Sequence, residues 1–529
     1  MQDVQFAASE TTFSDISNIP TGTTGHFSLH FYAVVARILV RLGTTGTGER
    51  NDTYFEQFPF LGGYQSMLGP LVPDGVPATQ GTWWDAQIAS LEAQTAEHLP
   101  IRALVAGAGL SMDEVRVLIA TGLVEEDIRF GALFAALQEP LVARRPCIGV
   151  LTWLLSDPGG ETLDGWSTTR SLLDAGLLQV ENRADPRAEW LLRVPPAAWD
   201  ALRGRPQARP APGITLQLAA EFPALDDLIL PEAVQARILH VPELLSDGRV
   251  AALVLRGMTG SGRRTTLGAV AREVKRDVLL WESGTTADEN WRLLGPLATL
   301  VGAMPILRCE PGPGETVDLP MLPGYSGPVG ITLGRSGGLR GPLIAHSLSL
   351  NLPPPDQEAR HRFWQATRVP VEVEALDEIV KRFLLTGGHI HRTASLSQAY
   401  AALENRQRIN VSDVQQATRA LNRQALETLA THLDPLESAE LVIGSSTSSE
   451  MRTLEARCYE REALRELAGR AFSNNLTRGV RALFSGPSGT GKTLAARVLA
   501  AKLQMDLYRV DLSAVVNKYI GETERNLNQ

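Results

Sequence analysis

Cysteine is scarce in this chain, which has three in 529 residues, Cys147, Cys309 and Cys458. They lie too far apart for the paired spacing of a structural zinc site, and they do not make a disulfide framework. A small secreted disulfide-rich fold is therefore excluded. This usage indicates a protein of the reducing cytoplasm.

Long apolar runs are also missing. The N-terminal residues Met1–Gln5 have no basic segment followed by an apolar core, so we predict no secretory signal. The most apolar early stretch, Phe27–Leu42, contains His30, Arg37 and Arg41, and it is too short and too charged to span a bilayer. We predict an amphipathic helix packed on its own domain, and no membrane partner.

An excess of positive charge is the third absence. The formal net charge is −9, which argues against a general nucleic-acid binder. With 44% hydrophobic and 21% charged residues, the composition is that of an ordinary globular chain. A length of 529 residues is enough for three or four domains.

Eight residues near the C-terminal end fit the phosphate-binding pattern G-x-x-x-x-G-K-[ST]. They are Gly486, Pro487, Ser488, Gly489, Thr490, Gly491, Lys492 and Thr493. The glycines let backbone N–H groups turn toward a triphosphate, Lys492 can reach the β- and γ-phosphates, and the Thr493 hydroxyl can bind Mg²⁺. Val480–Ser485 is predicted to be a buried strand leading in and Lys492–Leu503 a helix leading out. The expected cofactors are ATP and Mg²⁺.

The module is expected to be cut inside its own fold. Only 36 residues separate Thr493 from Gln529, whereas a P-loop module needs further strands, one of which carries an acidic pair for the metal and the attacking water. The catalytic residues are therefore unknown, and the acidic pair is expected beyond Gln529. Nucleotide binding is easier to defend than turnover for this polypeptide.

The pattern of strand, glycine turn and helix also occurs earlier in the chain, in an altered copy that contains Gly257. Aligning Gly257 with Gly486 gives an offset of 229 residues, which also aligns Arg263 with Lys492. Arg263 replaces the P-loop lysine, and a planar guanidinium does not substitute for a compact ammonium in that cradle. Arg264 takes the place of the magnesium-binding threonine.

The candidate acidic strand of this copy is also altered. It is Met304–Glu310, where Cys309 stands at the position expected for a metal-binding aspartate and only Glu310 could polarise water. Gly334 occupies the probable sensor position, where a polar residue is usual. We predict a structural copy that does not hydrolyse nucleotide.

Helices followed by a hairpin suggest a winged-helix domain over residues 96–204. Ser111 is the predicted cap of a helix start, and further helices are expected over Ala132–Leu137 and Ile148–Leu155. Two short apolar runs, Leu177–Val180 and Trp190–Val194, predict the hairpin.

The helix before this hairpin often reads DNA in such domains. Here it offers one cation, Arg170, offset by Asp174. Protein docking or packing is favoured over DNA reading.

The remaining boundaries follow changes in composition. The Pro/Arg/Gly-rich residues 205–215 predict a linker, and a weaker boundary falls near Asp434–Pro435. We predict a region of unknown role over 1–95, a degenerate module with a small α-helical lid over 216–434, and the N-terminal part of a second module over 435–529. In the lid, His389 and His391 are better explained by a cap and turn than by a metal.

These residues resemble the AAA+ ATPase superfamily, in the AAA subgroup that includes valosin-containing protein, the proteasomal ATPases and spastin. The marker beyond the P-loop is Asn517–Glu524, at the spacing of the first pore loop. The resemblance implies that Lys518, Tyr519, Ile520 and Gly521 grip a protein chain inside a hexameric ring. The whole layout is similar to bacterial two-module AAA ATPases with an N-terminal winged-helix domain, some of them encoded beside contractile injection systems.

The predicted fold class is multidomain α/β: a mostly α N-terminal region with a winged helix, a three-layer P-loop AAA module with a helical lid, and a truncated second P-loop module. The leading hypothesis is an ATPase, forming a homo-oligomeric ring, that couples ATP hydrolysis to remodelling or translocation of a protein partner. A nucleotide-responsive scaffold without threading is an alternative. A DNA-associated ATPase is another, although nucleic acid is the less favoured partner.

Overall fold

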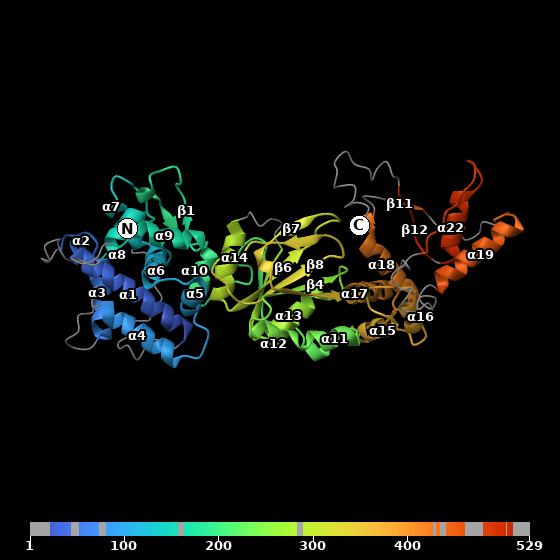
Figure 1. Ribbon diagram of the computed structural model, residues 1–529, viewed down its shortest axis with the longest axis horizontal. Helices are drawn as coiled ribbons and strands as arrows, with labels where there is room; N and C mark the ends of the chain where they lie inside the picture. The colour runs from blue at the N-terminus through green and yellow to red at the C-terminus, as the bar shows by residue number, and fades with distance from the viewer. Residues whose placement is uncertain are drawn as a thin grey trace. The chain divides into compact units, whose positions relative to one another are not determined.

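The computed structural model describes residues 22–43, 52–72, 81–156, 163–282, 289–426, 430–433, 441–460, 480–503 and 505–510. It divides into two compact units, Met1–Pro355 and Asp356–Gln529 (Figure 1). Each unit is described by itself.

The first unit begins with helices gathered around α1. They are α1 (Thr23–Gly43), α2 (Thr53–Gln57), α3 (Phe60–Leu68), the 3₁₀ helix η2 (Gly69–Leu71) and α4 (Gly81–Gln94). Thirteen residues of α1 are buried, so most of its circumference lies inside the unit. The predicted helix over 27–42 is confirmed and extends slightly beyond both ends. No helix among the described residues is both long and apolar enough to cross a membrane.

A second group of helices ends in a short hairpin. Its elements are α5 (Pro100–Ala108), α6 (Met112–Glu126), α7 (Arg129–Leu137), α8 (Ile148–Leu155), α9 (Gly165–Asp174), β1 (Gln179–Val180), β2 (Leu192–Arg193) and α10 (Pro196–Leu202). The predicted cap is confirmed, because the Ser111 hydroxyl accepts a hydrogen bond from the Glu114 amide at 3.3 Å and the Glu114 carboxylate accepts one from the Ser111 amide. Strands β1 and β2 pair antiparallel, as the two apolar runs predict.

The rest of this unit is built around one six-stranded sheet. Its strands are β3 (Ile214–Gln217), β4 (Ala252–Gly257), β5 (Asp277–Trp281), β6 (Ala303–Cys309), β8 (Val329–Leu333) and β10 (Ser347–Leu352). Their order is β10-β4-β8-β6-β5-β3, and every pair is parallel except β3 with β5. A separate parallel pair joins β7 (Thr316–Asp318) to β9 (Gly338–Arg340). Strand β4 therefore ends inside the sheet, between two parallel neighbours.

Helices cover both faces of this sheet (Figure 1). They are α11 (Glu232–Ile238), α12 (Val241–Ser246), α13 (Arg263–Glu273) and α14 (Glu289–Leu300). Along β5, Val278 and Leu280 share one apolar core with Val270 of α13, whereas Leu279 and Trp281 share the other with α14. Because successive strand residues point to opposite faces, this alternation makes three layers. The expected mixed α/β architecture, dominated by a parallel sheet, is confirmed.

The second unit begins with a helical group. It contains α15 (Gln357–Ala366), α16 (Ala375–Arg382), α17 (Gly387–Leu403) and α18 (Val411–Leu426). Ile379, Ile390 and Val414 are fully buried in its core. The Thr386 hydroxyl lies 2.8 Å from His389 Nδ1, which is the helix-start contact that the cap-and-turn interpretation expects.

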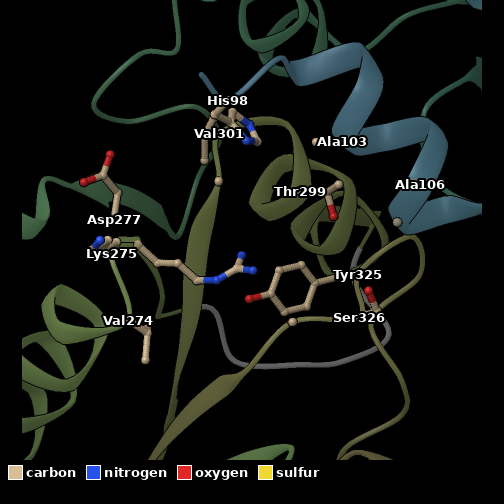
Figure 2. A pocket seen from close by; sticks show the side chains of 14 residues that line it. His98, Ala103, Ala106, Val274, Lys275, Asp277, Thr299, Val301, Tyr325 and Ser326 are labelled. Carbon is tan, nitrogen blue, oxygen red and sulfur yellow. The ribbon is translucent and has the colours of Figure 1, made fainter. Parts of the chain in front are cut away.

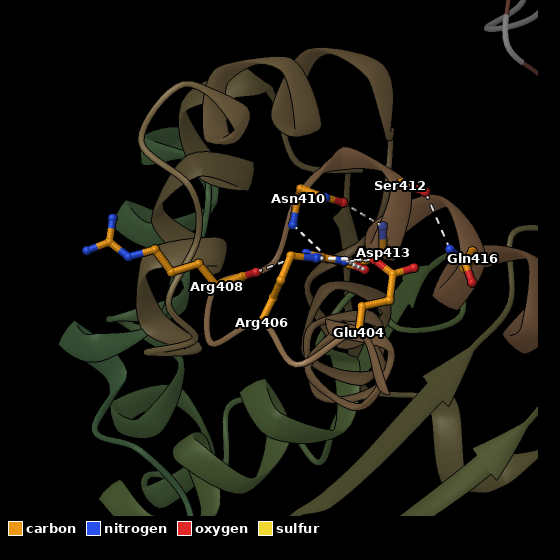
Figure 3. A network of polar contacts seen from close by, with 7 residues as sticks. All are labelled: Glu404, Arg406, Arg408, Asn410, Ser412, Asp413 and Gln416. Atoms are coloured by element: carbon orange, nitrogen blue, oxygen red, sulfur yellow. Dashed lines mark hydrogen bonds and ion pairs between the residues drawn. The ribbon is translucent and has the colours of Figure 1, made fainter. Parts of the chain in front are cut away.

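A polar network closes the loop between α17 and α18 (Figure 3). Both Arg406 terminal nitrogens donate to the Asp413 carboxylate at 2.7 Å, and the Asn410 amide donates to it at 2.8 Å. The Asp413 side chain is completely buried. A buried carboxylate with this many donors fixes the loop that joins the two helices.

The remaining described elements of the second unit are two helices and two strands. They are β11 (Ala430–Leu433), α19 (Ser445–Tyr459), α22 (Lys492–Lys502) and β12 (Leu507–Val510). Strands β11 and β12 pair antiparallel, with His432 opposite Tyr508.

Candidate functional site

The glycine loop before α22 has the backbone that its sequence predicts. Gly489 and Gly491 have φ angles of 83° and 82°, in the left-handed region that glycine adopts without strain. Gly486 has a φ of 154°, and a Cβ added there would lie 3.0 Å from the Thr490 hydroxyl. These positions therefore favour glycine for conformational as well as steric reasons.

The cation of the loop is placed to meet an anion. Lys492 is the first residue of α22, and its ammonium donates to the carbonyl oxygens of Gly486 at 2.9 Å and Pro487 at 2.7 Å. Its side chain is half-buried and that of Thr493 is exposed. The loop, the amine and the hydroxyl thus gather at the N-terminus of an 11-residue helix, where backbone N–H groups and the helix dipole favour negative charge.

These residues fit a magnesium-bound nucleoside triphosphate. Phosphate oxygens can accept from the loop amides and from Lys492, whose ammonium donates to carbonyls of its own loop. The exposed Thr493 hydroxyl provides a hard oxygen of the kind that Mg²⁺ prefers.

The predicted strand before this loop is not formed. Residues 480–485 have no strand pairing, and Leu483 is 93% exposed. A buried parallel strand needs partners on both edges, and the described residues place no strand beside 480–485. Among them, β12 pairs with β11 instead.

The earlier copy has the same backbone at the predicted offset. Helix α13 begins at Arg263 and ends at Glu273, each 229 residues before the corresponding end of α22. Gly260 and Gly262 have φ angles of 76° and 88°, close to those of Gly489 and Gly491. In its glycine turn and helix, but not in its strand, the repeat is therefore one of structure as well as of sequence.

The chemistry of the earlier copy is different. Arg263 Nη2 donates to Glu310 Oε1 at 2.9 Å, and the Arg263 side chain is only 8% exposed. The guanidinium at the lysine position thus holds the one carboxylate that could polarise water. Arg264 donates to the side chain of Gln217, so its guanidinium is engaged away from any metal.

Two further residues of this copy are unsuited to binding a metal ion. Burial raises the pKa of the Cys309 thiol to about 12, so it stays protonated and provides no magnesium ligand. Gly334 lies against Glu310, because a Cβ there would be 3.0 Å from Glu310 Oε2. The residues present do not fit a magnesium-bound triphosphate in this copy.

The second set of predicted site residues, Lys518, Tyr519, Ile520 and Gly521, lies outside the described residues. So does Asn517 through Glu524 as a whole, which carries the pore-loop pattern.

One cavity was missed in the sequence. A space of about 580 Å³ lies between α5 and the edge of the sheet, with Lys275 and Asp277 on one side and Thr299 and Tyr325 on the other (Figure 2). His98 Nε2 lies 2.8 Å from the Leu300 carbonyl oxygen, which ties the chain before α5 to the end of α14. The residues that line the cavity are spread over the sequence from 98 to 327, so no local sequence pattern could have predicted the cavity.

Comparison with known proteins addresses the C-terminal segment. Residues 482–529 match the family model described as ATPase family associated with various cellular activities (AAA). This stretch is similar to the AAA family. Residues 482–529 are called the AAA segment below, after the family that they resemble.

Three relatives illustrate the match. The AAA family ATPase y4kL of Sinorhizobium fredii is 47% identical over 47 residues, which are 9% of this chain and 14% of that protein. Peroxisomal ATPase PEX6 of Debaryomyces hansenii is 41% identical over 58 residues, 11% of this chain and 5% of that protein. The 26S proteasome regulatory subunit 10B of Dictyostelium discoideum is 49% identical over 47 residues, 9% of this chain and 12% of that protein. The chain thus spans a small fraction of these relatives' length.

Solved structures give a weak likeness. A RuvB mutant of Thermotoga maritima has a TM-score of 0.29 at 16% identity and covers 39% of this chain and 78% of its own. A structure described as Structural Basis for Katanin Self-Assembly has a TM-score of 0.28 at 16% identity and covers 40% of this chain and 88% of its own. These scores are too low to assign a fold.

Proposed function

We propose that this chain binds MgATP in the loop Gly486–Thr493 of its AAA segment, and that the protein couples ATP hydrolysis to the remodelling or translocation of a protein partner. One observation carries the proposal. A half-buried lysine at a helix N-terminus, preceded by two left-handed glycines, lies inside the segment that matches the AAA family.

Each group has a defined part in nucleotide binding. The amides of the loop and of the N-terminus of α22 donate hydrogen bonds to the phosphate oxygens, and the Lys492 ammonium adds a positive charge beside them. Thr493 would hold the metal, which neutralises the developing charge during phosphoryl transfer. The groups that orient the attacking water in this module are not among the residues assigned here.

The earlier copy has a structural part in this proposal. Its glycine turn and helix repeat those of the later copy, but Arg263, at the lysine position, is paired with Glu310. It therefore braces a ring rather than hydrolysing ATP. The module boundaries of this proposal are 216–434 and 435–529, joined to the N-terminal regions 1–95 and 96–204 through the 205–215 linker.

The partner-facing parts are also proposals. Lys518, Tyr519, Ile520 and Gly521 grip a protein chain in the channel of a homo-oligomeric, hexameric ring. The winged-helix-like domain docks the partner. DNA reading is less favoured because Arg170, the cation of α9, lies 3.6 Å from Asp174 and is offset by it.

Lys492→Ala tests the nucleotide site. Loss of a charge-assisted contact costs about 1.5–3 kcal/mol, so we expect MgATP affinity to fall roughly 10- to 100-fold in calorimetry. Lys502→Ala is the matched control, since it removes the same charge from the other end of α22, where the amine is 3.6 Å from Glu455. Equal MgATP affinity for wild type and Lys492→Ala would refute the site.

A nucleotide-responsive scaffold without threading is the second candidate. The Arg263–Glu310 pair of the earlier copy favours the scaffold, because one of the two nucleotide modules then hydrolyses no ATP. Slow turnover together with a large ATP-dependent change in oligomer size would select the scaffold. Rapid turnover stimulated by an unfolded protein would select the motor.

A further inference from the structure

Helix α4 carries a carboxylate in its buried stripe. Trp84 and Ile88 are buried at 0% and 4% exposure, and Glu92 follows them at the same four-residue spacing. Residues four apart lie on one face of a helix. Glu92 therefore extends toward α1, where an apolar side chain would be expected, and its side chain remains 30% exposed.

Helix α1 presents two imidazoles to this carboxylate. His26 and His30 are also four residues apart, and they are 0% and 4% exposed. His26 Nε2 lies 2.8 Å from Glu92 Oε1 and 3.3 Å from His30 Nε2. One ligand atom from each of the three residues lies within 4.8 Å of the others. A search of the described residues for three or more histidine, cysteine or carboxylate groups close enough to share an ion gives this one cluster.

The protons of this cluster do not satisfy all of its contacts. If His26 Nε2 carries a proton that it donates to Glu92, that nitrogen has no lone pair to accept from His30. If it carries none, its lone pair faces an acceptor carboxylate. Charging His26 leaves a proton on Nδ1, which is buried without a hydrogen-bond partner.

A cation at the centre removes the conflict among the three facing atoms, because both Nε2 lone pairs and the Glu92 carboxylate can face it. The His26 proton then lies on Nδ1, which has no hydrogen-bond partner. Zinc–nitrogen bonds are about 2.0–2.1 Å long, so two nitrogens at a tetrahedral zinc lie roughly 3.3–3.4 Å apart. The observed separation of the two Nε2 atoms is 3.3 Å. The Glu92 oxygen has to move, by about half an ångström away from His26 on the same geometry, and toward His30, since the three ligand atoms lie within 4.8 Å of one another. Its partly exposed side chain permits that movement.

The protonation state suits a metal. Burial lowers the pKa of His30 to about 3, and burial also lowers the pKa of His26. Neutral imidazoles keep the lone pair that binds metals. Of the two nearby cations, Arg116 is paired with Asp85 and Asp113, and Arg102 donates to backbone carbonyls at the end of α4.

We propose that His26, His30 and Glu92 bind a divalent transition-metal ion of the zinc class, which cross-links α1 to α4. Two imidazoles and one carboxylate are a zinc donor set that leaves a fourth position for water. The ion enters past Glu92, which is the exposed member of the set. Binding stabilises the N-terminal helices by mass action because the unfolded chain does not hold the three groups together.

Cobalt titration tests this site. The full chain is treated with a chelator, exchanged into magnesium-free and nucleotide-free buffer, and titrated with Co²⁺ while its visible absorption is followed. We expect one equivalent of Co²⁺ to give ligand-field bands, Zn²⁺ to displace it, and Zn²⁺ to raise the melting temperature of the N-terminal helices.

Glu92→Gln is the decisive variant because it keeps the shape of a partly exposed side chain. We expect at least a tenfold loss of Co²⁺ affinity, with the melting temperature in chelator close to that of wild type. Glu97→Gln is the control, since its exposed carboxylate lies just beyond α4 and outside the cluster.

His30→Asn extends the test on α1, although its burial makes a folding defect possible for that variant alone. The proposal is overturned if chelator-treated wild type takes up no Co²⁺ at micromolar free metal. It is also overturned if Glu92→Gln binds Co²⁺ as tightly as wild type.

Discussion

The Arg263 guanidinium donates a hydrogen bond to Glu310 over 2.9 Å. In the earlier copy of the repeat, Arg263 has the position that Lys492 has in the later copy. The two copies share the backbone of the glycine turn and the helix, and they differ in what their first helical side chain binds. In one copy that side chain is paired with a carboxylate of its own sheet. In the other it donates to carbonyls of its own loop.

Removing the Glu310 charge should weaken the first unit and leave ATP binding intact. Glu310→Gln strands a guanidinium that is 8% exposed, and loss of a hydrogen bond between charged groups costs about 2 kcal/mol. Urea unfolding of the first unit measures this. Glu282→Gln is the control because its pairing with Arg308, at 3.8 Å and half-exposed, contributes about 0.5 kcal/mol or less. Weaker MgATP binding by Glu310→Gln would contradict the division of roles between the copies.

Thr493 and Thr490 should separate metal binding from loop structure. Thr493→Ala is expected to weaken nucleotide binding about tenfold in Mg²⁺ and to change it little in EDTA, because the hydroxyl is exposed and available to the metal. Thr490 donates to the Pro487 carbonyl at 2.9 Å, so Thr490→Ala should weaken binding under both conditions. Calorimetry with and without Mg²⁺ decides, and equal losses for Thr493→Ala in both buffers would remove its metal role.

Asp413 should make the second unit acid-sensitive. Burial is the largest single influence and opposes its ionisation, but the hydrogen bonds from Arg406 and the Asn410 amide, together with the charge of Arg406, lower the pKa of Asp413 below its ordinary value of 3.8. Because the folded pKa is the lower one, the stabilisation is complete above the unfolded pKa and is lost as pH falls through the folded value.

Asp413→Asn should therefore lower the melting temperature of the second unit by several degrees at pH 7. The variant should also lose less further stability than wild type below pH 4, the window set by that lowered pKa. Asp377→Asn, whose side chain is 79% exposed, is the control. Identical acid profiles for wild type and Asp413→Asn would show that the network does not titrate with folding.

Tyr519 tests the proposed grip on a protein partner. Tyr519→Ala should leave MgATP affinity unchanged and abolish processing of an unfolded protein. Tyr508→Ala, in β12, controls for loss of an aromatic nearby. Equal processing by wild type and Tyr519→Ala would favour the scaffold over the motor.

Local patterns were enough to predict the glycine loop, its helix and the damaged copy. Lys492 and Arg263 each begin a helix after two left-handed glycines, and both features depend on residues within a few positions of each other. The cap at Ser111 was predicted for the same reason. Backbone conformation and spacing are local, so the sequence carried them.

The pairing of strands and the meeting of distant side chains were decided only by tertiary structure. Leu483 looked like part of a buried strand but is 93% exposed, because a strand depends on neighbours that its own residues do not supply. Glu310 acquired its partner, and Glu92 its two histidines, from packing across 47 and 66 residues of chain. Apolar periodicity brings helices together, but which polar atoms then converge depends on the register of packed elements, and no local pattern records that register.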